Sequence, residues 1–424
     1  MKNRYLTAKS PNGISAQEIE QNISEYLGNY SGIKNILILP PDISRLNSYA
    51  GDIVNMLYKY FKDVNIDIMP ALGTHTPMTD GEITKMFGAI PRDRFVAHNW
   101  RNDTVKVGEV PADYVKEISD GYMDNSIDVE VNKRLLDKKY DLIISIGQVV
   151  PHEIAGFASY TKNIMVGCGG SKMINQSHYL GALYGMERIM GRADTPVRKL
   201  YNYGVNNFLS HIPLIYILTV TTIDKSGLKV EAVSIGTGDE LFFQTAKVSH
   251  EKNLNFLDKP IQKAVVYLDP EEFKTTWIGN KSIYRTRMAI ADGGELIVIA
   301  PALHACGEDL ENDRLIKKYG YICRDEVLDA VRNNEDLRNN LSVAAHLIHG
   351  SSEGRFKITY APGKMTKEQV LSIKYDYMPI EDALKMYDIN SLKDGFNTVN
   401  GEEIFYVSNP ALGLWTTRSR FDIG

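Results

Sequence analysis

The amino-acid sequence predicts an α/β protein of two α/β domains with largely parallel sheets. Short apolar runs end at polar or glycine-rich turns, which is typical of strands. The runs are uniformly apolar rather than alternating, which favours strands covered on both faces of a parallel sheet. Helix-like stretches lie between them, and strand alternating with helix favours doubly wound layers. The predicted strands are Ile36–Leu39, Val64–Met69, Leu142–Ile146, Ile215–Val220, Val265–Leu268 and Leu296–Ala300.

Helices are predicted where apolar residues recur at helical spacing. Thr79 precedes one of them and is expected to be its N-cap, because a threonine side chain can accept a hydrogen bond from the first turn. The predicted helices are Ala16–Leu27, Asp52–Phe61, Thr79–Phe87, Lys367–Ile373 and Ile380–Tyr387.

The length of 424 residues suits two or three domains. A charged, proline-containing link at Phe256–Pro260 precedes a new strand–helix–strand series. We therefore expect one domain over residues 1–265, joined by residues 402–424, and a second over residues 266–401. A cleft between two domains is a common place for a site, and we expect the second domain to close it over a substrate.

Composition argues against several classes of protein. The 48 Lys and Arg against 53 Asp and Glu give a net charge of -5, which offers no basic surface for nucleic acid. Three cysteines are too few for a disulfide framework or a four-thiolate zinc site. There is no apolar run of about 18 residues to span a membrane, and the first residues lack the apolar core of a signal peptide. We expect a cytoplasmic protein that binds neither nucleic acid nor membrane.

Ionisable side chains follow three of the predicted strands. In parallel sheets, ligands bind at the carboxyl ends of strands, so these residues are the first candidates for a site. Histidine titrates near neutral pH and suits proton transfer, whereas Asp42 and Ser44 could equally cap the next helix. The residues are Asp42-Ile43-Ser44-Arg45 after the first strand, Gly73-Thr74-His75 after the second and His152-Glu153 after the third.

The segment after His152 is the densest in chemistry. It holds a glycine-rich turn, Lys162, Lys172 and His178. A catalytic role for Cys168 has no signature to support it. The glycines before Lys172 lack the spacing of a P-loop, and neither HExxH nor paired CxxC occurs to indicate zinc.

Together these motifs resemble the lactate racemase family, whose members carry a nickel-pincer nucleotide. The family shows an Asp-x-x-Arg turn, here Asp42 to Arg45, and a Gly-x-His turn, here Gly73 to His75. A histidine runs into Gly-Phe, a lysine follows ten residues after it (152 to 162), and another histidine follows sixteen residues later (162 to 178). The similarity covers the first half of the chain well and the second half more loosely.

The resemblance implies a role for each matching residue. Lys162 would hold the cofactor covalently through a thioamide, and His178 would complete the coordination of nickel. Imidazole nitrogen suits nickel, and a planar N/S/C ligand set fits its preference for square geometry. The turn Asp42-Ile43-Ser44-Arg45 would bind the nucleotide, with the arginine fork matching phosphate.

The implied activity is racemisation or C2-epimerisation of a 2-hydroxy acid. His75 and His152 would exchange the hydroxyl proton, while the C2 hydrogen moves as hydride to and from the cofactor. The chain departs from the family before the lysine, where Ala158-Ser159-Tyr160 replaces Ser-Gly-Gly, and Lys172 is therefore a competitor for the tether.

A second departure lies in the second domain. Where the family presents Tyr-Gln and then a lysine three residues on, this chain has Tyr284, Arg285 and Met288, with Arg287 beside it. We expect Tyr284, Arg285 and Arg287 to contact substrate, and two arginines favour an acid larger than lactate, such as a sugar acid. The alternative is that both arginines lie on a solvated helix face.

Two other functions remain open. A nicotinamide-dependent 2-hydroxy acid dehydrogenase also moves hydride, but no GxGxxG follows a strand. A non-catalytic binding homologue would have no need of His75, His152, Lys162 and His178 together. The expected partners are the small-molecule substrate and the enzymes of cofactor synthesis, and assembly into a homo-oligomer is open.

Overall fold

The computed structural model describes residues 2–423 and divides them into two compact units. The first unit runs to Leu180 and resumes over Met190–Asn253, and the second consists of Gly181–Ile189 and the chain from Leu254 onward. Each unit has its own six-stranded sheet.

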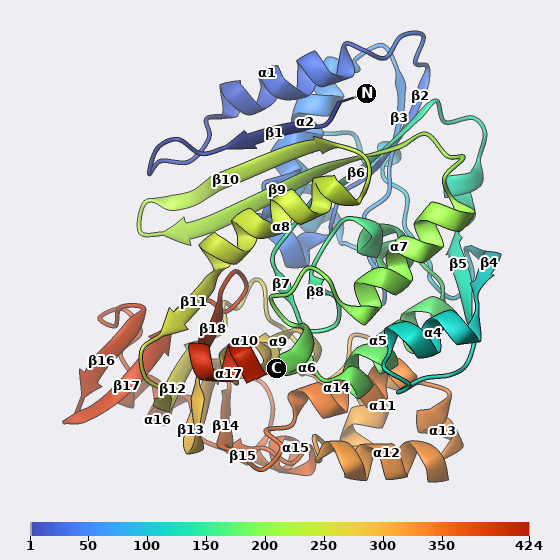
Figure 1. The fold of residues 1–424 in the computed structure, drawn as a ribbon. Coiled ribbons are helices and arrows are strands. Elements are labelled where there is room, and N and C mark those ends of the chain that lie inside the picture. The colour runs from blue at the N-terminus through green and yellow to red at the C-terminus, as the bar shows by residue number, and fades with distance from the viewer. Residues whose placement is uncertain (1, 424) are drawn as a thin grey trace. The chain divides into compact units, whose positions relative to one another are not determined.

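The first unit is built on the sheet order β1-β10-β9-β6-β2-β3 (Figure 1). Strands β9, β6, β2 and β3 run parallel, while β10 and β1 add antiparallel strands at one edge. The strands are β1 Arg4–Thr7, β2 Asn35–Leu39, β3 Asn65–Ile68, β6 Leu142–Gln148, β9 Leu214–Asp224 and β10 Gly227–Gly236. Smaller pairs are β4 Thr104–Val110 with β5 Ile127–Asn132, and β7 Pro151–His152 with β8 Gly156–Phe157.

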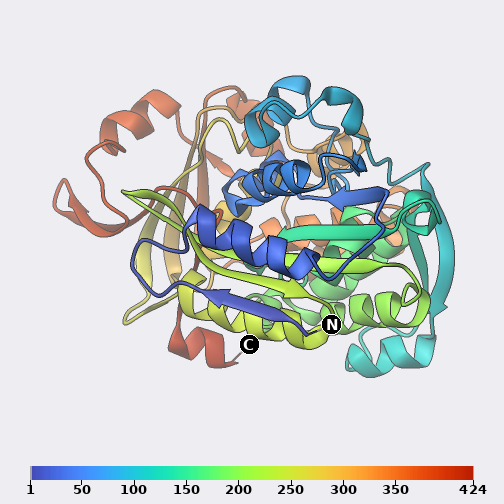
Figure 2. The same ribbon diagram turned by 90° about the horizontal axis from the view of Figure 1, so that it is seen from above.

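Helices cover both faces of this sheet (Figures 1 and 2). On one face α1, α2 and α3 close the main apolar core, and α8 packs on β9 and β10 from the other side. Capping boxes at Ser15 and Thr79 fix the starts of α1 and α3. The helices are α1 Ala16–Leu27, α2 Ala50–Tyr60, α3 Asp80–Phe87, α4 Ala112–Ile118, α5 Ser171–Tyr184, α7 Pro196–Phe208 and α8 Asp239–Asn253, with 3₁₀ turns Ile43–Ser48, Arg92–Arg94 and Lys133–Leu136 and a π-helix Asn163–Gly167.

The second unit has the sheet order β15-β14-β13-β12-β17-β16, parallel except for the β16–β17 pair. The strands are β12 Ile261–Tyr267, β13 Ile290–Ala300, β14 Lys357–Pro362, β15 Asp376–Tyr377, β16 Gly395–Val399 and β17 Glu402–Val407, and β11 Leu254–Leu257 pairs with β18 Leu414–Thr417. The helices are α6 Met186–Ile189, α9 Thr276–Gly279, α10 Lys281–Thr286, α11 Leu310–Tyr319, α12 Arg324–Asn333, α13 Glu335–Arg338, α14 Leu341–Gly350, α15 Lys367–Ser372, α16 Ile380–Met386 and α17 Arg418–Ile423.

The predicted fold class is confirmed, since both units are mixed α/β with mainly parallel sheets. All six predicted strands are present within a few residues of their expected bounds.

The structure corrects the predicted division of the chain. Residues 402–424 lie in the second unit, because β17 pairs with β12 and β18 pairs with β11. For the same reason the second unit begins at Leu254 rather than residue 266, and it also takes in Gly181–Ile189. Within residues 2–423, no helix is long and apolar enough to cross a membrane.

Candidate functional site

The three strands that precede the candidate residues are neighbours in the first sheet. Strand β2 pairs in parallel with β3 on one side and with β6 on the other. Their carboxyl ends therefore deliver Asp42, His75 and His152 to one edge of the sheet. The chain moves from β2 to β3 and then returns to β6 on the opposite side of β2, and such a reversal of direction opens a crevice in this class of sheet.

Asp42 and His75 form a close pair at this edge. The Nδ1 atom of His75 lies 2.6 Å from Oδ2 of Asp42, and Asp42 is buried. The other carboxylate oxygen, Oδ1, accepts hydrogen bonds from the backbone N–H of Ser44 at 3.2 Å and from its hydroxyl at 2.5 Å. Asp42 thus caps the 3₁₀ turn and also holds His75. Because a carboxylate accepts the Nδ1 proton, the Nε2 lone pair of His75 is the one that can act as a base.

A glycine turn lets the His75 segment approach the lysine-bearing segment. Gly73 adopts φ +58, a left-handed conformation that suits glycine, and its N–H donates to the carbonyl of Gly167 at 3.0 Å. A Cβ at Gly167 would lie only 2.6 Å from Cβ of Ala71. Glycine at both positions therefore allows the two backbones to meet, and it brings His75 to the π-helix that follows Lys162.

Lys162 is partly buried and lies within electrostatic range of the other candidates. Burial, and then the positive charge of Arg45, lower the pKa of its amine to about 8, although Glu153 and Asp42 act in the opposite direction. An amine with such a pKa is substantially neutral near pH 8, and the neutral form is the nucleophile. Lys172, in contrast, is exposed, and the contact there is its backbone N–H donating to Glu130. Of the two candidate lysines, Lys162 is thus the one that lies among the other candidate residues.

His178 is held with one ring nitrogen available as a ligand. Its Nδ1 lies 2.7 Å from the carbonyl oxygen of Ile174, one helical turn earlier in α5. Nδ1–H donates there, which leaves the lone pair on Nε2. Burial is the largest cause that lowers the pKa of His178 to about 3, and the charges of Lys162 and His75 act in the same direction. The imidazole therefore stays neutral over the physiological range, as a metal ligand must.

His152 is buried and has a different arrangement from that of His75. Its Nδ1 accepts the backbone N–H of Ile154 at 3.1 Å, so the neutral ring carries its proton on Nε2. That nitrogen lies 3.6 Å from Oε1 of Glu153. In their neutral forms the two histidines would therefore carry the proton on different nitrogens, Nδ1 in His75 and Nε2 in His152.

The remaining predicted residues of the first turn divide between the core and the site. Ile43 packs against the apolar core of the first unit. Ser44 is buried against Asp42, and Arg45 is partly buried and lies close enough to Lys162 to shift the pKa of that lysine.

Cys168 is buried, and burial raises the pKa of its thiol to about 12. The thiol therefore stays protonated, which argues against a nucleophilic role.

The structure places Tyr284, Arg285 and Arg287 on and just after α10 in the second unit. All three are buried, so the alternative of a solvated helix face is wrong. The hydroxyl of Tyr284 lies 2.8 Å from Nδ1 of His346, and Arg285 donates to the carbonyl of Gly413 at 3.4 Å. Their contact with substrate stays a prediction.

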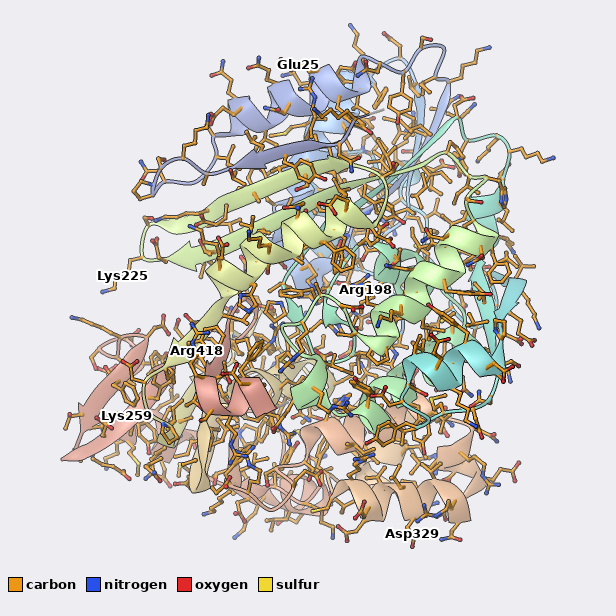
Figure 3. All side chains as sticks on the ribbon, in the orientation of Figure 1. Glu25, Arg198, Lys225, Lys259, Asp329 and Arg418 are labelled. Atoms are coloured by element: carbon orange, nitrogen blue, oxygen red, sulfur yellow. The ribbon has the colours of Figure 1, made fainter. Side chains whose placement is uncertain are left out.

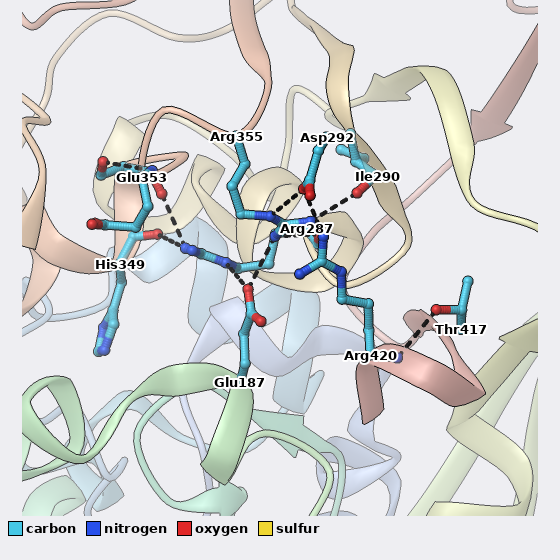
Figure 4. A network of polar contacts seen from close by, with 10 residues as sticks. Glu187, Arg287, Ile290, Asp292, His349, Glu353, Arg355, Thr417 and Arg420 are labelled. Atoms are coloured by element: carbon cyan, nitrogen blue, oxygen red, sulfur yellow. Dashed lines mark hydrogen bonds and ion pairs between the residues drawn. The ribbon is translucent and has the colours of Figure 1, made fainter. Parts of the chain in front are cut away.

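Arg287 belongs to a network of ion pairs (Figure 4). Its Nε donates to Glu187 at 3.1 Å and its Nη1 to the carbonyl of Ser351 at 3.0 Å. Arg355 also binds Glu187, at 3.2 Å, and reaches Asp292 at 2.8 Å. This network attaches the segment Gly181–Ile189 to the second unit, so Arg287 has a structural partner already.

Glu153, a candidate from the end of the third predicted strand, stands beside His152 and raises the pKa of Lys162. A second residue near the site was not predicted as functional. Arg198 in α7 is fully buried against the segment before Lys162. Nothing in the local sequence of α7 distinguishes Arg198 from a surface arginine. Among residues 2–423 no group of three or more His, Cys, Asp or Glu is placed to hold a metal ion.

Comparison with known proteins agrees with the resemblance. Residues 23–189 match the family model of the lactate racemase N-terminal domain. The chain is 27% identical over 181 residues to the lactate racemase of Lactiplantibacillus plantarum, which is 39% of each protein. It is 28% identical over 154 residues to that of Thermoanaerobacterium thermosaccharolyticum, which is 35% of this chain and 33% of the relative. The matches thus span less than half the length of these relatives.

Two solved structures share the fold over nearly the whole chain. A crystal structure of a protein from Thermotoga maritima has a TM-score of 0.84 at 22% identity, covering 97% of this chain and 100% of that one. The lactate racemase apoprotein from Thermoanaerobacterium thermosaccharolyticum has a TM-score of 0.67 at 18% identity, covering 95% and 93%. At these identities the likeness shows the fold alone.

Proposed function

We propose that this protein is an isomerase that inverts C2 of a 2-hydroxy acid, because residues 23–189 match the family model of the lactate racemase N-terminal domain. The observation that carries the proposal is the convergence of four segments at one sheet edge. Lys162 is influenced by Arg45, Glu153 and Asp42, and His178 by Lys162 and His75. The ends of the predicted strands, together with the family resemblance, predicted this grouping.

The residues present fit a covalently held nickel-pincer nucleotide. The amine of Lys162 has the lowered pKa that a tethering nucleophile needs, and His178 keeps one nitrogen free of its helix to serve as a ligand. Arg45 supplies a positive charge beside Lys162 that suits a phosphate. When bound, the cofactor would supply the hydride acceptor and donor that C2 chemistry requires.

The histidines would handle the hydroxyl proton. His75, with Nδ1–H held by Asp42, presents Nε2 to take the proton as C2 becomes trigonal. His152, with its proton on Nε2, is oriented to donate to the oxygen from the other side. A full proton transfer from His152 requires Nδ1 to give up its bond with Ile154, so the two histidines would not be equivalent.

The structure narrows the substrate class less than we expected from the sequence. Arg287 is already bound to Glu187 and to backbone carbonyls, so it offers less to a substrate carboxylate. Recognition of a sugar acid or another larger acid would therefore depend on Arg285 and Tyr284. We propose a 2-hydroxy acid as the substrate, with lactate as one member of the series to be tried.

An isotope experiment tests the reaction class. The protein is produced together with the cofactor-synthesis enzymes and given single enantiomers of 2-hydroxy acids deuterated at C2, in ordinary water. The proposal expects inversion with the deuterium retained at C2, because hydride returns to the carbon it left. Inversion with loss of deuterium would instead indicate proton abstraction, and bound NAD with net oxidation would indicate a dehydrogenase. Binding of the acid without inversion would indicate a non-catalytic homologue.

A further inference from the structure

The segment before Lys162 has a backbone that its residues do not favour. Ser159 has φ +70 and Tyr160 has φ +59, and neither is glycine. The left-handed conformation is unfavourable for a residue with a Cβ, because the Cβ comes too close to the following carbonyl oxygen. Two such residues in succession persist only where the surroundings hold them. The family has glycine at these positions, so this chain needs a different means of keeping the conformation.

Arg198 holds this segment from inside the first unit (Figure 3). Its side chain is 1% exposed. Its Nη2 donates to the carbonyl of Phe157 at 2.6 Å, and its Nη1 donates to the carbonyl of Ser159 at 3.1 Å and to the hydroxyl of Thr161 at 2.8 Å. The guanidinium therefore spans alternate residues of the segment, and its planar fork fixes their spacing. Thr161 passes the hydrogen bond on to Asn202, also in α7, at 2.7 Å.

Tyr160 fastens the same segment to α8. Its ring stacks on Phe242 with centroids 5.4 Å apart and lies 4.4 Å from the ring of Tyr216. Its hydroxyl donates to Asp239 at 3.0 Å. Phe242 also lies under the guanidinium of Arg198, at 4.1 Å. The side chain of Tyr160, which stands where the family has glycine, is thus held by ring contacts and by a hydrogen bond.

We propose that Arg198 and Tyr160 are positioning residues that set the place of the Lys162 amine at the carboxyl edge of the sheet. Arg198 holds the backbone in its left-handed path, and Tyr160 fixes that path to α8. The proposal depends on the proposed function only for the tethering role of Lys162. It also explains how this chain can do without the two glycines that the family has at positions 159 and 160. Buried side-chain contacts stabilise the left-handed conformation that glycine adopts without strain.

Backbone hydrogen bonds at both ends of the segment before Lys162 depend on the path of that segment. The N–H of Asn163 donates to the carbonyl of Tyr160 at 3.0 Å, and that of Ala158 donates to Val150 at 2.8 Å. These bonds form only when the segment keeps its path. Amide hydrogen exchange at 158–163 therefore follows the conformation independently of any cofactor.

The test compares Arg198→Lys and Tyr160→Phe with Lys199→Ala as the matched control. Lysine keeps the charge of Arg198 but loses the fork, phenylalanine keeps the ring but loses the bond to Asp239, and Lys199 is an exposed neighbour on the same helix. Three quantities are measured: amide exchange at 158–163, the acetylation rate of Lys162 relative to exposed Lys172 in the cofactor-free protein, and the fraction of Lys162 carrying covalent cofactor mass after co-production with the synthesis enzymes.

The expected result is at least tenfold faster exchange at 158–163 in Arg198→Lys and a smaller rise in Tyr160→Phe, with the control unchanged. The ratio of acetylation at Lys162 to that at Lys172 should shift at least threefold, and adduct formation on Lys162 should slow. Unchanged exchange in both variants overturns the proposal, as does faster exchange with an unchanged acetylation ratio. Absence of any adduct in the unmodified protein counts against the proposed function alone, because exchange and acetylation still decide the roles of Arg198 and Tyr160. If Arg198→Lys fails to fold, the same two measurements on Tyr160→Phe decide whether the proposal stands.

Discussion

Replacing Asp42 with asparagine tests how the structure prepares His75 as a base. The carboxylate accepts from Nδ1 of His75 at 2.6 Å and from Ser44 through its other oxygen. Asparagine has only one oxygen. If that oxygen keeps the two bonds to Ser44, the amide NH₂ faces His75, so Nδ1 must accept and the ring proton moves to Nε2. The lone pair that would take the substrate proton is then lost.

The size of the effect follows from these contacts. A hydrogen bond to a charged group contributes about 1.5–3 kcal/mol, which corresponds to about ten- to a hundredfold in rate. Loss of a positioned general base costs about 10²–10⁴-fold. We expect Asp42→Asn to lower kcat about 10²–10⁴-fold per cofactor-loaded site, because the tautomer is reversed as well as the charge removed.

The assay must separate the role of Asp42 towards His75 from its predicted role in binding the nucleotide. Interconversion of enantiomers is followed by chiral chromatography, and nickel and the covalent adduct are measured for each preparation. Ser44→Ala is the control, since it removes only the hydroxyl bond to Oδ1 and leaves the backbone bond and the pair between Asp42 and His75 intact. A kcat within threefold of the unmodified protein at equal loading would refute the reasoning, and a loss of loading alone would assign Asp42 to the nucleotide.

Three further predictions concern other contacts. The pKa of Lys162 in the folded protein is lowered to about 8 from its ordinary value of about 10.5. Between these two pH values the unfolded chain binds the proton more readily than the folded protein does. Lys162 therefore lowers the free energy of unfolding, fully below about pH 8 and progressively less as the pH rises to about 10.5. Lys162→Met should raise the Tm of the cofactor-free protein at pH 7 and raise it less at pH 10; an equal rise at both would contradict the linkage. His178→Ala should lower nickel content with the adduct on Lys162 retained, measured by metal analysis and peptide mapping, because it removes a ligand and no tether. Glu187→Gln should cost about 1–3 kcal/mol in denaturant unfolding, because buried Arg287 loses its charged partner, whereas exposed Asp329→Asn should change stability by less than about 0.5 kcal/mol.

Local sequence predicted the elements and their ends well. The helix Ala16–Leu27 has the predicted bounds, and Thr79 caps α3 as expected. These features depend on side chains within a few residues of one another, so the pattern contains the cause. The assignment of 402–424 failed for the opposite reason. The pairing of β17 with β12 joins residues far apart in the sequence, and no local pattern specifies it.

The sequence by itself determined which residues could do chemistry here. Parallel strands end at one edge, so Asp42, His75 and His152 were expected to meet, and the spacing of Lys162 and His178 matched a known family. Only the tertiary structure decided how they act. Tautomers, pKa shifts and burial depend on neighbours from other segments, because electrostatic and hydrogen-bond energies are set by distance in space rather than along the chain.

The same distinction explains the two arginine outcomes. Arg287 looked like a substrate contact, yet its guanidinium binds Glu187, a residue 100 positions away. Arg198 looked like an ordinary helical arginine, yet it supports the backbone before Lys162. An arginine carries the same charge wherever it stands, and its role is fixed by which acceptors the fold places within about 3 Å of its five donors.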